Sequence, residues 1–209
     1  METSMNAADY FAEHLTGNPV MAIFRGSAPE RTVELCESAW NAGVGLVEVP
    51  VQSPDALASF AAAVAAGRDR GKHVGAGTVL SVEQLERVVA MGATFTVAPG
   101  FDADVAQRAA ELGVAHLPGV ATSSEIGWAL RSGCSWVKAF PAAELGTSWL
   151  RAQKGPFPNV SFVATGGITA ANAAEYLAAG FSAVAVGAAF SSPESVELLT
   201  RSIAEVARA

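Results

Sequence analysis

A pattern that returns along the chain most constrains its fold: a helical stretch, then a glycine, then a short apolar run. Each glycine stands where a helix needs a left-handed residue to end, and the apolar run that follows within a few residues is typical of a buried strand. The pattern is seen around Gly43, Gly92, Gly113, Gly133 and Gly180. Together with the other apolar runs, it predicts eight strands centred on Ala22, Val47, Val74, Thr96, His116, Val137, Val163 and Val184.

The segments between these strands are expected to be amphipathic helices, for example over residues 30–41, 82–91 and 170–179. Some helix starts carry a capping-box spacing, in which Ser or Thr is followed three residues later by Glu or Gln. Such spacings begin at Ser27, Ser81 and Thr122.

About eight strand–helix units within 209 residues predict one α/β domain, a (β/α)8 or TIM barrel spanning residues 1–209. Residues 5–16 are expected to form an extra N-terminal helix that covers the bottom of the barrel. The alternative is an open, doubly wound sheet, which also has parallel strands. It is disfavoured because no G-x-G-x-x-G motif opens a helix after the first strand.

Composition narrows the function classes. Hydrophobic residues make up 51% of the chain and charged residues 16%, which is typical of a folded domain rather than a disordered one. The net charge of −7 gives no general basic surface for nucleic acid, so we expect no nucleic-acid partner. An anionic small molecule remains compatible with this charge, because a local pocket can be positive in an acidic protein.

The sequence shows no signal for targeting or for metal binding. The first residues lack the basic and apolar segments of a signal peptide, and apolar runs are shorter than a membrane span. Cys36 and Cys134 have neither metal-ligand nor C-x-x-C spacing, which is typical of a reducing compartment. His14, His73 and His116 are scattered without ligand spacing. The sequence thus predicts a soluble, cytoplasmic protein with no metal, no cofactor and no membrane partner.

Lys138 interrupts a short apolar run that is typical of a buried strand. A lone strand lysine most often packs its stem and keeps its amine in water. Here, however, Lys138 and Glu48 each lie five residues after a helix-ending glycine, Gly133 and Gly43, so an amine and an acid share one register on two strands. In a barrel, functional residues lie at the C-terminal ends of strands. A functional pair is therefore favoured over a structural ion pair, which is a weak source of stability when buried.

The chemistry that needs such a pair is imine catalysis. Burial disfavours the ammonium form of Lys138, so a free amine becomes available to attack a ketone. Glu48 can then move protons while the carbinolamine forms and dehydrates and a C–C bond breaks.

Glycines supply a second set of candidate residues. Strands seven and eight end in glycine-rich loops, the place where barrels often bind phosphate through backbone N–H groups. The candidate phosphate ligands are Gly166, Gly167, Gly187 and Ala188. Tight turns that bind nothing have the same composition, and a phosphosugar isomerase would use such loops as readily as an aldolase.

Two further residues suit the carboxylate of a substrate. Arg25 follows the first strand, and its guanidinium matches a carboxylate, although a solvated loop arginine would have the same sequence context. The stretch 75–79, Gly-Ala-Gly-Thr-Val, indicates a close approach of the backbone to a ligand, with the Thr78 hydroxyl available.

Taken together, these residues resemble the family of 2-keto-3-deoxy-6-phosphogluconate (KDPG) and 4-hydroxy-2-oxoglutarate (KHG) aldolases, which are class I aldolases on a (β/α)8 barrel. The resemblance runs from about Val20 to the end of the chain. It rests on segments that are weak singly but specific in this order: Arg25-Gly26, Val47-Glu48-Val49-Pro50, Gly75–Val79, Pro118-Gly119, Lys138–Ala142 and Thr165–Ile168.

The resemblance implies that Lys138 is the Schiff-base lysine and Glu48 the general acid and base. It implies that Arg25 and Thr78 hold the pyruvyl carboxylate, an end of the site to which we also assign Gln52. The expected remainder of the pocket consists of Gly77, Pro99, Pro118, Phe140 and Thr165. No cofactor is implied, the expected partners are a 2-keto acid, pyruvate and an aldehyde, and members of the family are typically homotrimers.

Two positions depart from the family pattern. Many KDPG enzymes carry an arginine four residues after the glutamate, where this chain has Gln52, as in the 6-phosphogalactonate (KDPGal) branch. Relatives also often place a serine near the phosphate, where this chain has Ala189. The loss of these contacts leaves Arg25 as the main fixed cation and weakens the expectation of tight phosphate binding.

The function predicted is reversible cleavage of a 2-keto-3-deoxy-6-phospho sugar acid, KDPG or KDPGal, to pyruvate and glyceraldehyde 3-phosphate. One alternative is an aldolase for KHG or another non-phosphorylated 2-keto acid. A second is an isomerase or epimerase that uses the same phosphate loops, and a third is a barrel that binds a ligand without catalysis.

Overall fold

The computed structural model describes residues 7–206 and residue 208. Helices and strands alternate through this range, and none of these helices is long and apolar enough to cross a bilayer. The elements are α1 (Ala7–Leu15), β1 (Val20–Ile23), α2 (Pro29–Asn41), β2 (Leu46–Pro50), α3 (Pro54–Asp69), β3 (His73–Gly77), α4 (Val82–Ala90), β4 (Phe95–Val97), α5 (Ala103–Leu112), β5 (Ala115–Leu117), β6 (Gly119–Val120), α6 (Ser123–Arg131), β7 (Trp136–Ala139), α7 (Ala142–Lys154), β8 (Ser161–Thr165), α8 (Ala173–Ala178), β9 (Ala183–Val186), the 3-10 helix η1 (Ala188–Ser191) and α9 (Pro193–Val206).

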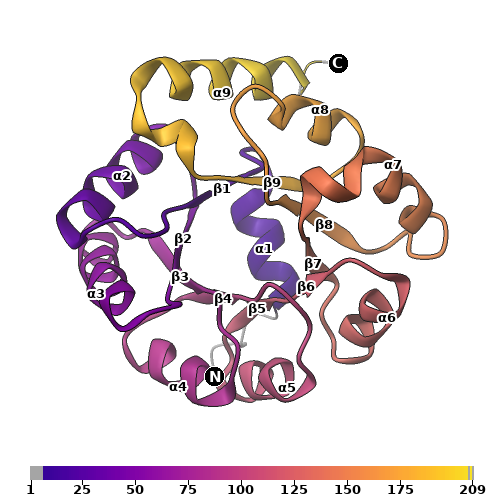
Figure 1. The fold of residues 1–209 in the computed structure, drawn as a ribbon, viewed down its shortest axis with the longest axis horizontal. Coiled ribbons are helices and arrows are strands. Elements are labelled where there is room, and N and C mark those ends of the chain that lie inside the picture. The colour runs from indigo at the N-terminus through magenta and orange to yellow at the C-terminus, as the bar shows by residue number, and fades with distance from the viewer. Residues whose placement is uncertain (1–6, 207, 209) are drawn as a thin grey trace.

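The strands close into a ring because the order β5-β4-β3-β2-β1-β9-β8-β7-β6 ends in two strands, β5 and β6, that follow one another in the chain and are separated only by Pro118. The first and last strands of this order are therefore neighbours. Ala22 of β1 is paired with Val47 of β2 and with Val186 of β9, and both pairings are parallel. Because no free sheet edge remains between β5 and β6, an open, doubly wound sheet is excluded, and the predicted (β/α)8 barrel is confirmed. Figure 1 looks down this ring of strands and shows the helices arranged around it.

Nine strands are distinguished in the described residues, but they fill eight positions of the barrel. β5 and β6 are separated only by Pro118, and β5 pairs with β4 while β6 pairs with β7. Proline has no N–H to give to a ladder, so it interrupts this strand position. The Pro118 carbonyl still accepts a hydrogen bond of 2.8 Å from the Lys138 N–H. The strand expected around His116 is thus two short strands.

One face of each strand points into the barrel, where an apolar layer fills the end at which the strands begin. The helix α1 closes this end, and Figure 1 shows it across the centre of the ring. Phe11 of α1 makes edge contact with Phe95 at 6.0 Å between ring centroids. The layer includes Phe11, Leu15, Met21, Leu46, Phe95 and Val163.

The extra N-terminal helix is confirmed as α1, which ends at Leu15, one residue before the predicted end. Residues 5 and 6 of the predicted range lie outside the described residues.

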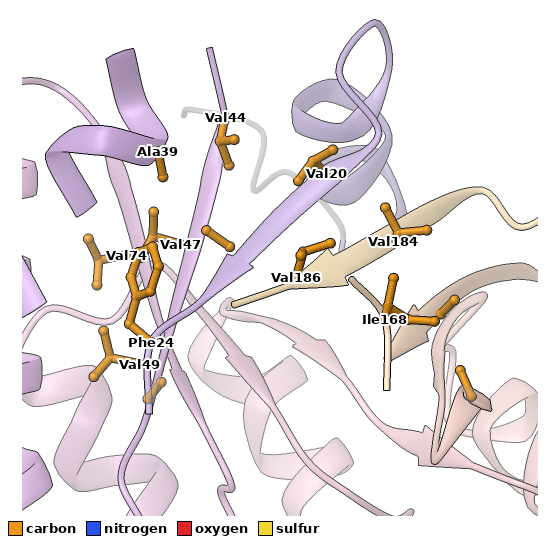
Figure 2. Close-up of a cluster of buried hydrophobic side chains, with 14 of the residues drawn as sticks. Val20, Phe24, Ala39, Val44, Val47, Val49, Val74, Ile168, Val184 and Val186 are labelled. Carbon is orange, nitrogen blue, oxygen red and sulfur yellow. The ribbon is translucent and has the colours of Figure 1, made fainter. Parts of the chain in front are cut away.

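The opposite face of each strand packs against the surrounding helices. Strand valines alternate with the inward-facing residues and meet helix residues such as Ala39, as Figure 2 shows for one side of the barrel. This second layer is why the strands are apolar on both faces rather than alternating with polar residues. Among those labelled in the figure are Val20, Val47, Val49, Val74, Val184 and Val186.

The local signals of the sequence are mostly confirmed. All five glycines of the repeat have positive φ, between 67° and 104°. Thr122 and Glu125 form a complete capping box. Ser81 accepts a hydrogen bond from the Gln84 N–H, while the Gln84 side chain turns to the N–H of Leu80.

Two predictions of helix starts need correction. Ala28, not Ser27, precedes the first residue of α2, and it makes no side-chain capping bond. The segment predicted as a helix over residues 170–179 is shorter, because α8 begins at Ala173. The Asn172 side chain accepts a hydrogen bond of 2.7 Å from the Thr169 N–H and thus holds the preceding residues in a turn.

Candidate active site

Glu48 lies on β2 on the face that points into the barrel, two residues beyond Leu46 of the apolar layer. Its side chain is fully buried, and neither carboxylate oxygen has a hydrogen-bond partner within the described residues. Burial raises the pKa of Glu48, an effect that the positive charges of Lys138 and Arg25 oppose. A buried carboxylate without partners is costly, so its presence indicates a function rather than a contribution to stability.

Lys138 occupies the corresponding place on β7, and it is 3% exposed. Its Nζ lies 4.9 Å from the centre of the Phe140 ring. Burial lowers the pKa of Lys138, the charge of Glu48 works in the opposite direction, and the charge of Arg25 lowers it further. The site therefore favours the free amine, the form that can act as a nucleophile.

Arg25 is exposed in the loop after β1, and its positive charge lowers the pKa of both Glu48 and Lys138. It is therefore placed as a cation at the edge of the buried pair. Thr78 follows β3 and is partly buried, with φ of 60°. A β-branched residue in this region is strained by about 1–3 kcal/mol, and strain of this kind is concentrated at functional sites.

The glycines of the last two strand loops have packing reasons of their own. Gly166 and Gly167 have φ of 92° and 73°. A Cβ at Gly187 would lie 2.5 Å from the carbonyl oxygen of Ile23, so only glycine fits there. The carbonyls of Gly166 and Gly167 accept hydrogen bonds from the Ala143 N–H and the Asn172 side chain, which fixes these peptide planes. This rigid backbone could bind an anion such as phosphate. The packing contacts alone already explain the glycines, so phosphate binding stays a prediction.

The loop after β9 continues from Gly187 into η1, whose first residue, Ala188, is exposed. Ala189 is buried, at 3% exposure. The Ala189 side chain is thus buried in the protein, while Ala188 is exposed to solvent.

The remaining predicted pocket residues also lie at the carboxyl ends of strands. Thr165 ends β8, is 4% exposed, and its hydroxyl has no partner among the described residues. Phe140 follows β7, and a Cβ at Gly166 would lie 3.1 Å from its ring. Pro118 directly follows β5, and its carbonyl accepts a hydrogen bond from the Lys138 N–H.

Pro99 is connected to the same region through Gly119. The Pro99 carbonyl oxygen fills the space that a Cβ of Gly119 would need. The Gly119 N–H also donates to the Gly100 carbonyl, at 3.2 Å. These contacts join the loop after β4 to the interrupted strand beside Lys138.

Gln52 is the predicted site residue with the least connection to this group. It is exposed in the loop after β2 and lines a hollow of about 210 Å³ with residues of α3 and α4, including Gln84 and Arg87. Its assignment to the carboxylate end of the site therefore stays a prediction.

Ala143, at the start of α7, was not singled out from the sequence. Its N–H donates to Gly166, and its methyl group lies where a Cβ of Gly167 would be. Both contacts use the backbone or a methyl group, so no chemical signature in the sequence could mark them.

No group of three or more His, Cys, Asp or Glu side chains in the described range is placed to hold a metal ion. His116 bonds to Thr96 at 2.9 Å in the layer between barrel and helices, and burial lowers its pKa to about 4. It is a buried histidine away from the inner face of the barrel, and its Nε2 has no partner among the described residues.

Comparison with known proteins bears on this site. The family model described as KDPG and KHG aldolase matches residues 11–206. The chain is 33% identical over 193 residues to the 2-dehydro-3-deoxy-6-phosphogalactonate aldolase of Escherichia coli K12, a match that covers 91% of this chain and 94% of that one. It is 42% identical over 152 residues to the 2-dehydro-3-deoxy-phosphogluconate aldolase of Treponema pallidum, with 71% and 70% covered.

A solved structure gives the same result. The KDPG aldolase of Legionella pneumophila, captured with pyruvate as a covalent carbinolamine intermediate, superimposes with a TM-score of 0.81 at 29% identity, covering 98% of this chain and 99% of that one. The ring of parallel strands, the buried acid–amine pair and these matches lead to one conclusion: this chain belongs to the KDPG and KHG aldolase family.

Proposed function

We propose that the protein is a class I aldolase that reversibly cleaves a 2-keto-3-deoxy-6-phospho sugar acid to pyruvate and glyceraldehyde 3-phosphate. The observation that carries the proposal is the buried pair of Glu48 and Lys138 on the inner face of the barrel. The galactonate epimer is the first candidate substrate, because the match to the KDPGal enzyme spans 94% of that enzyme.

The reaction depends on the protonation states of these two side chains. The neutral amine of Lys138 attacks the C2 ketone, and loss of water leaves an iminium. Glu48 takes the proton of the C4 hydroxyl, the C3–C4 bond breaks toward the iminium nitrogen, and the aldehyde leaves. Protonation of the enamine at C3 and hydrolysis then return pyruvate and the free amine.

Arg25 and Thr78 are proposed to hold the carboxylate of the substrate. The support is the position of Arg25, whose positive charge lowers the pKa of Lys138, and the strained backbone of Thr78 at the end of β3. The phosphate is assigned to the backbone of Gly166, Gly167 and Gly187, with Ala188 following.

The imine is tested by intact-protein mass spectrometry after incubation with pyruvate and borohydride. The chain has only three lysines, Lys72, Lys138 and Lys154, so a single adduct is readily mapped. We expect one reduced adduct on the wild type, none on Lys138→Met, and one on Lys154→Met. Lys154 is the matched control because burial also lowers its pKa, while its Nζ donates to Val160. Trapping on folded Lys138→Met would refute the mechanism.

The substrate is tested by pyruvate release from KDPGal, KDPG, their dephosphorylated forms and 4-hydroxy-2-oxoglutarate. We expect the phosphorylated acids to have the highest kcat/KM. Higher kcat/KM for 4-hydroxy-2-oxoglutarate would favour the non-phosphorylated alternative, which is consistent with Gln52 and Ala189 in place of an arginine and a serine. Turnover of a sugar phosphate without pyruvate would indicate an isomerase.

We also infer a homotrimer in the cytoplasm. The trimer is supported by the resemblance to the family, whose members are typically homotrimers. Both cysteines are free, as expected in a reducing compartment. Light scattering after gel filtration tests the first inference, and cell fractionation tests the second.

A further inference from the structure

Gly77, the last residue of β3, lies directly against the Glu48 side chain. A Cβ built on Gly77 would meet the Oε1 atom, and it would lie 2.6 Å from Cδ and 2.8 Å from Cγ of Glu48. Real Cβ atoms are not found at such distances, so the carboxylate occupies the space that any other residue at position 77 would fill. The sequence predicted a ligand close to this glycine, whereas the space above it holds a side chain of the protein.

The backbone conformation gives no other reason for glycine here. Gly77 does not have positive φ, and it is paired in the regular β2–β3 ladder with Pro50. Any residue could adopt this conformation. The requirement for glycine is therefore one of space, and the space is set by Glu48.

We propose that Gly77 is a positioning residue, which leaves room for the Glu48 carboxylate to lie against β3 and so fixes where the proton acceptor stands. This inference rests on the proposed role of Glu48. Gly77 touches neither substrate nor Lys138 in this scheme, and it acts only through the carboxylate.

The neighbouring Gly75 shows why the effect would be on function rather than on folding. A Cβ at Gly75 would lie 2.5 Å from the ring of Phe95, which is fully buried. A ring in the apolar layer cannot yield without repacking. The obstacle at Gly77 is the Glu48 side chain from Cγ outward, which can turn about its own single bonds, whereas the Phe95 ring moves only as a unit. Gly77→Ala should therefore displace the carboxylate and leave the barrel intact.

The experiment compares Gly77→Ala and Gly75→Ala, each alone, with Gly77→Ala also placed in the Glu48→Gln background. The readouts are kcat and KM for aldol cleavage, deuterium exchange at the pyruvate methyl group, borohydride trapping at Lys138, and urea unfolding. Methyl exchange reports the proton transfer assigned to Glu48, and trapping reports the amine.

We expect Gly77→Ala to lower kcat and methyl exchange by about tenfold or more, within the range of general acid–base catalysis. KM and trapping should change by less than about threefold, and unfolding should stay close to that of the wild type. In the Glu48→Gln background, Gly77→Ala should add less than about twofold, because both changes act through one group. Gly75→Ala should lose stability and keep methyl exchange per folded molecule.

Two results would overturn the inference. Wild-type methyl exchange in Gly77→Ala, with Glu48→Gln slow, would refute the role of Gly77 and leave the proposed function standing. Equal losses from Gly77→Ala with and without the Glu48 carboxylate would show that it acts by blocking substrate. Full cleavage activity of Glu48→Gln would refute the role assigned to Glu48 and the inference with it, whereas absence of cleavage by the wild type would refute the proposed function itself.

Discussion

The two ends of the barrel interior are built from the same strands and differ completely. Leu46 and Val163 lie at the end closed by α1, in a layer with Phe11. Two residues further along those strands stand Glu48 and Thr165, whose side-chain oxygens are buried without partners in the described structure. We call these ends the floor and the mouth.

The floor stabilises the folded protein, whereas the unpaired polar atoms of the mouth destabilise it. Each buried apolar side chain of the floor contributes about 1.5–3 kcal/mol. Each unpaired buried polar atom of the mouth costs about 1–3 kcal/mol. A period of two places both kinds of residue on one face of a strand, so a rigid floor lies directly below a reactive mouth.

The largest effect is expected at the mouth. Glu48→Gln should slow cleavage by about 10²–10⁴-fold, because the amide cannot accept the C4 hydroxyl proton. Its free energy of unfolding should be unchanged or higher, because a buried carboxylate without partners is removed. A coupled pyruvate assay and urea unfolding measure the two quantities. A marked loss of stability would contradict the distinction between floor and mouth.

The floor should respond in the opposite way. Phe11→Ala removes a fully buried ring and should lower the free energy of unfolding by about 3–5 kcal/mol. Below the transition, kcat per folded molecule should be unchanged. The exposed Glu13 on the same helix provides the control, since Glu13→Ala should have little effect on unfolding. Loss of kcat in folded Phe11→Ala would show that the floor takes part in positioning the mouth.

His116 tests a buried polar group outside both ends. Its pKa is about 4 in the folded protein, below the ordinary value of 6.5, because burial disfavours the charged ring. The unfolded chain therefore binds the proton first as the pH falls. The contribution of neutral His116 is fully present above pH 6.5, and about 3 kcal/mol of it is lost by about pH 4. Urea unfolding across this range should show a flatter profile for His116→Gln than for the wild type.

The smallest effect is expected for the charge at the edge of the mouth. Arg25 lowers the pKa of Lys138, so Arg25→Gln should raise that pKa. The midpoint in a pH series of borohydride trapping should move upward, and KM for pyruvate should increase by about tenfold through loss of a charged hydrogen bond. Arg31→Gln is the control, because Arg31 is exposed and pairs with Glu34 on α2. An unchanged midpoint would contradict the placement of Arg25 close to Lys138.

The fold was largely predictable because its determinants are local. Helix-ending glycines such as Gly43 and Gly133 have positive φ, and the strand centres fell within the observed strands. The interruption at Pro118 was missed because its neighbours on both sides are apolar, and the break depends on pairing with two different strands. The start of α8 was missed because the Asn172 side chain competes with the helix.

The site was predictable where it depends on register. Counting from Gly43 and Gly133 placed Glu48 and Lys138 at matched heights, and the structure buries both. Contacts between strands could not be read in this way. The carboxylate of Glu48 lies in the space left by Gly77, and neither residue type reveals that contact in the sequence.

The closure of the ring through β1 and β9 has a consequence for how the chain is made. β1 leaves the ribosome long before its partner β9, because the two strands lie about 160 residues apart in the sequence. Until β9 emerges, β1 has one unpaired edge that can pair with a foreign strand, and long-range closure of this kind is slow. A chain that lacks β9 should therefore need protection during translation, and the barrel becomes resistant to proteolysis only after β9 has emerged.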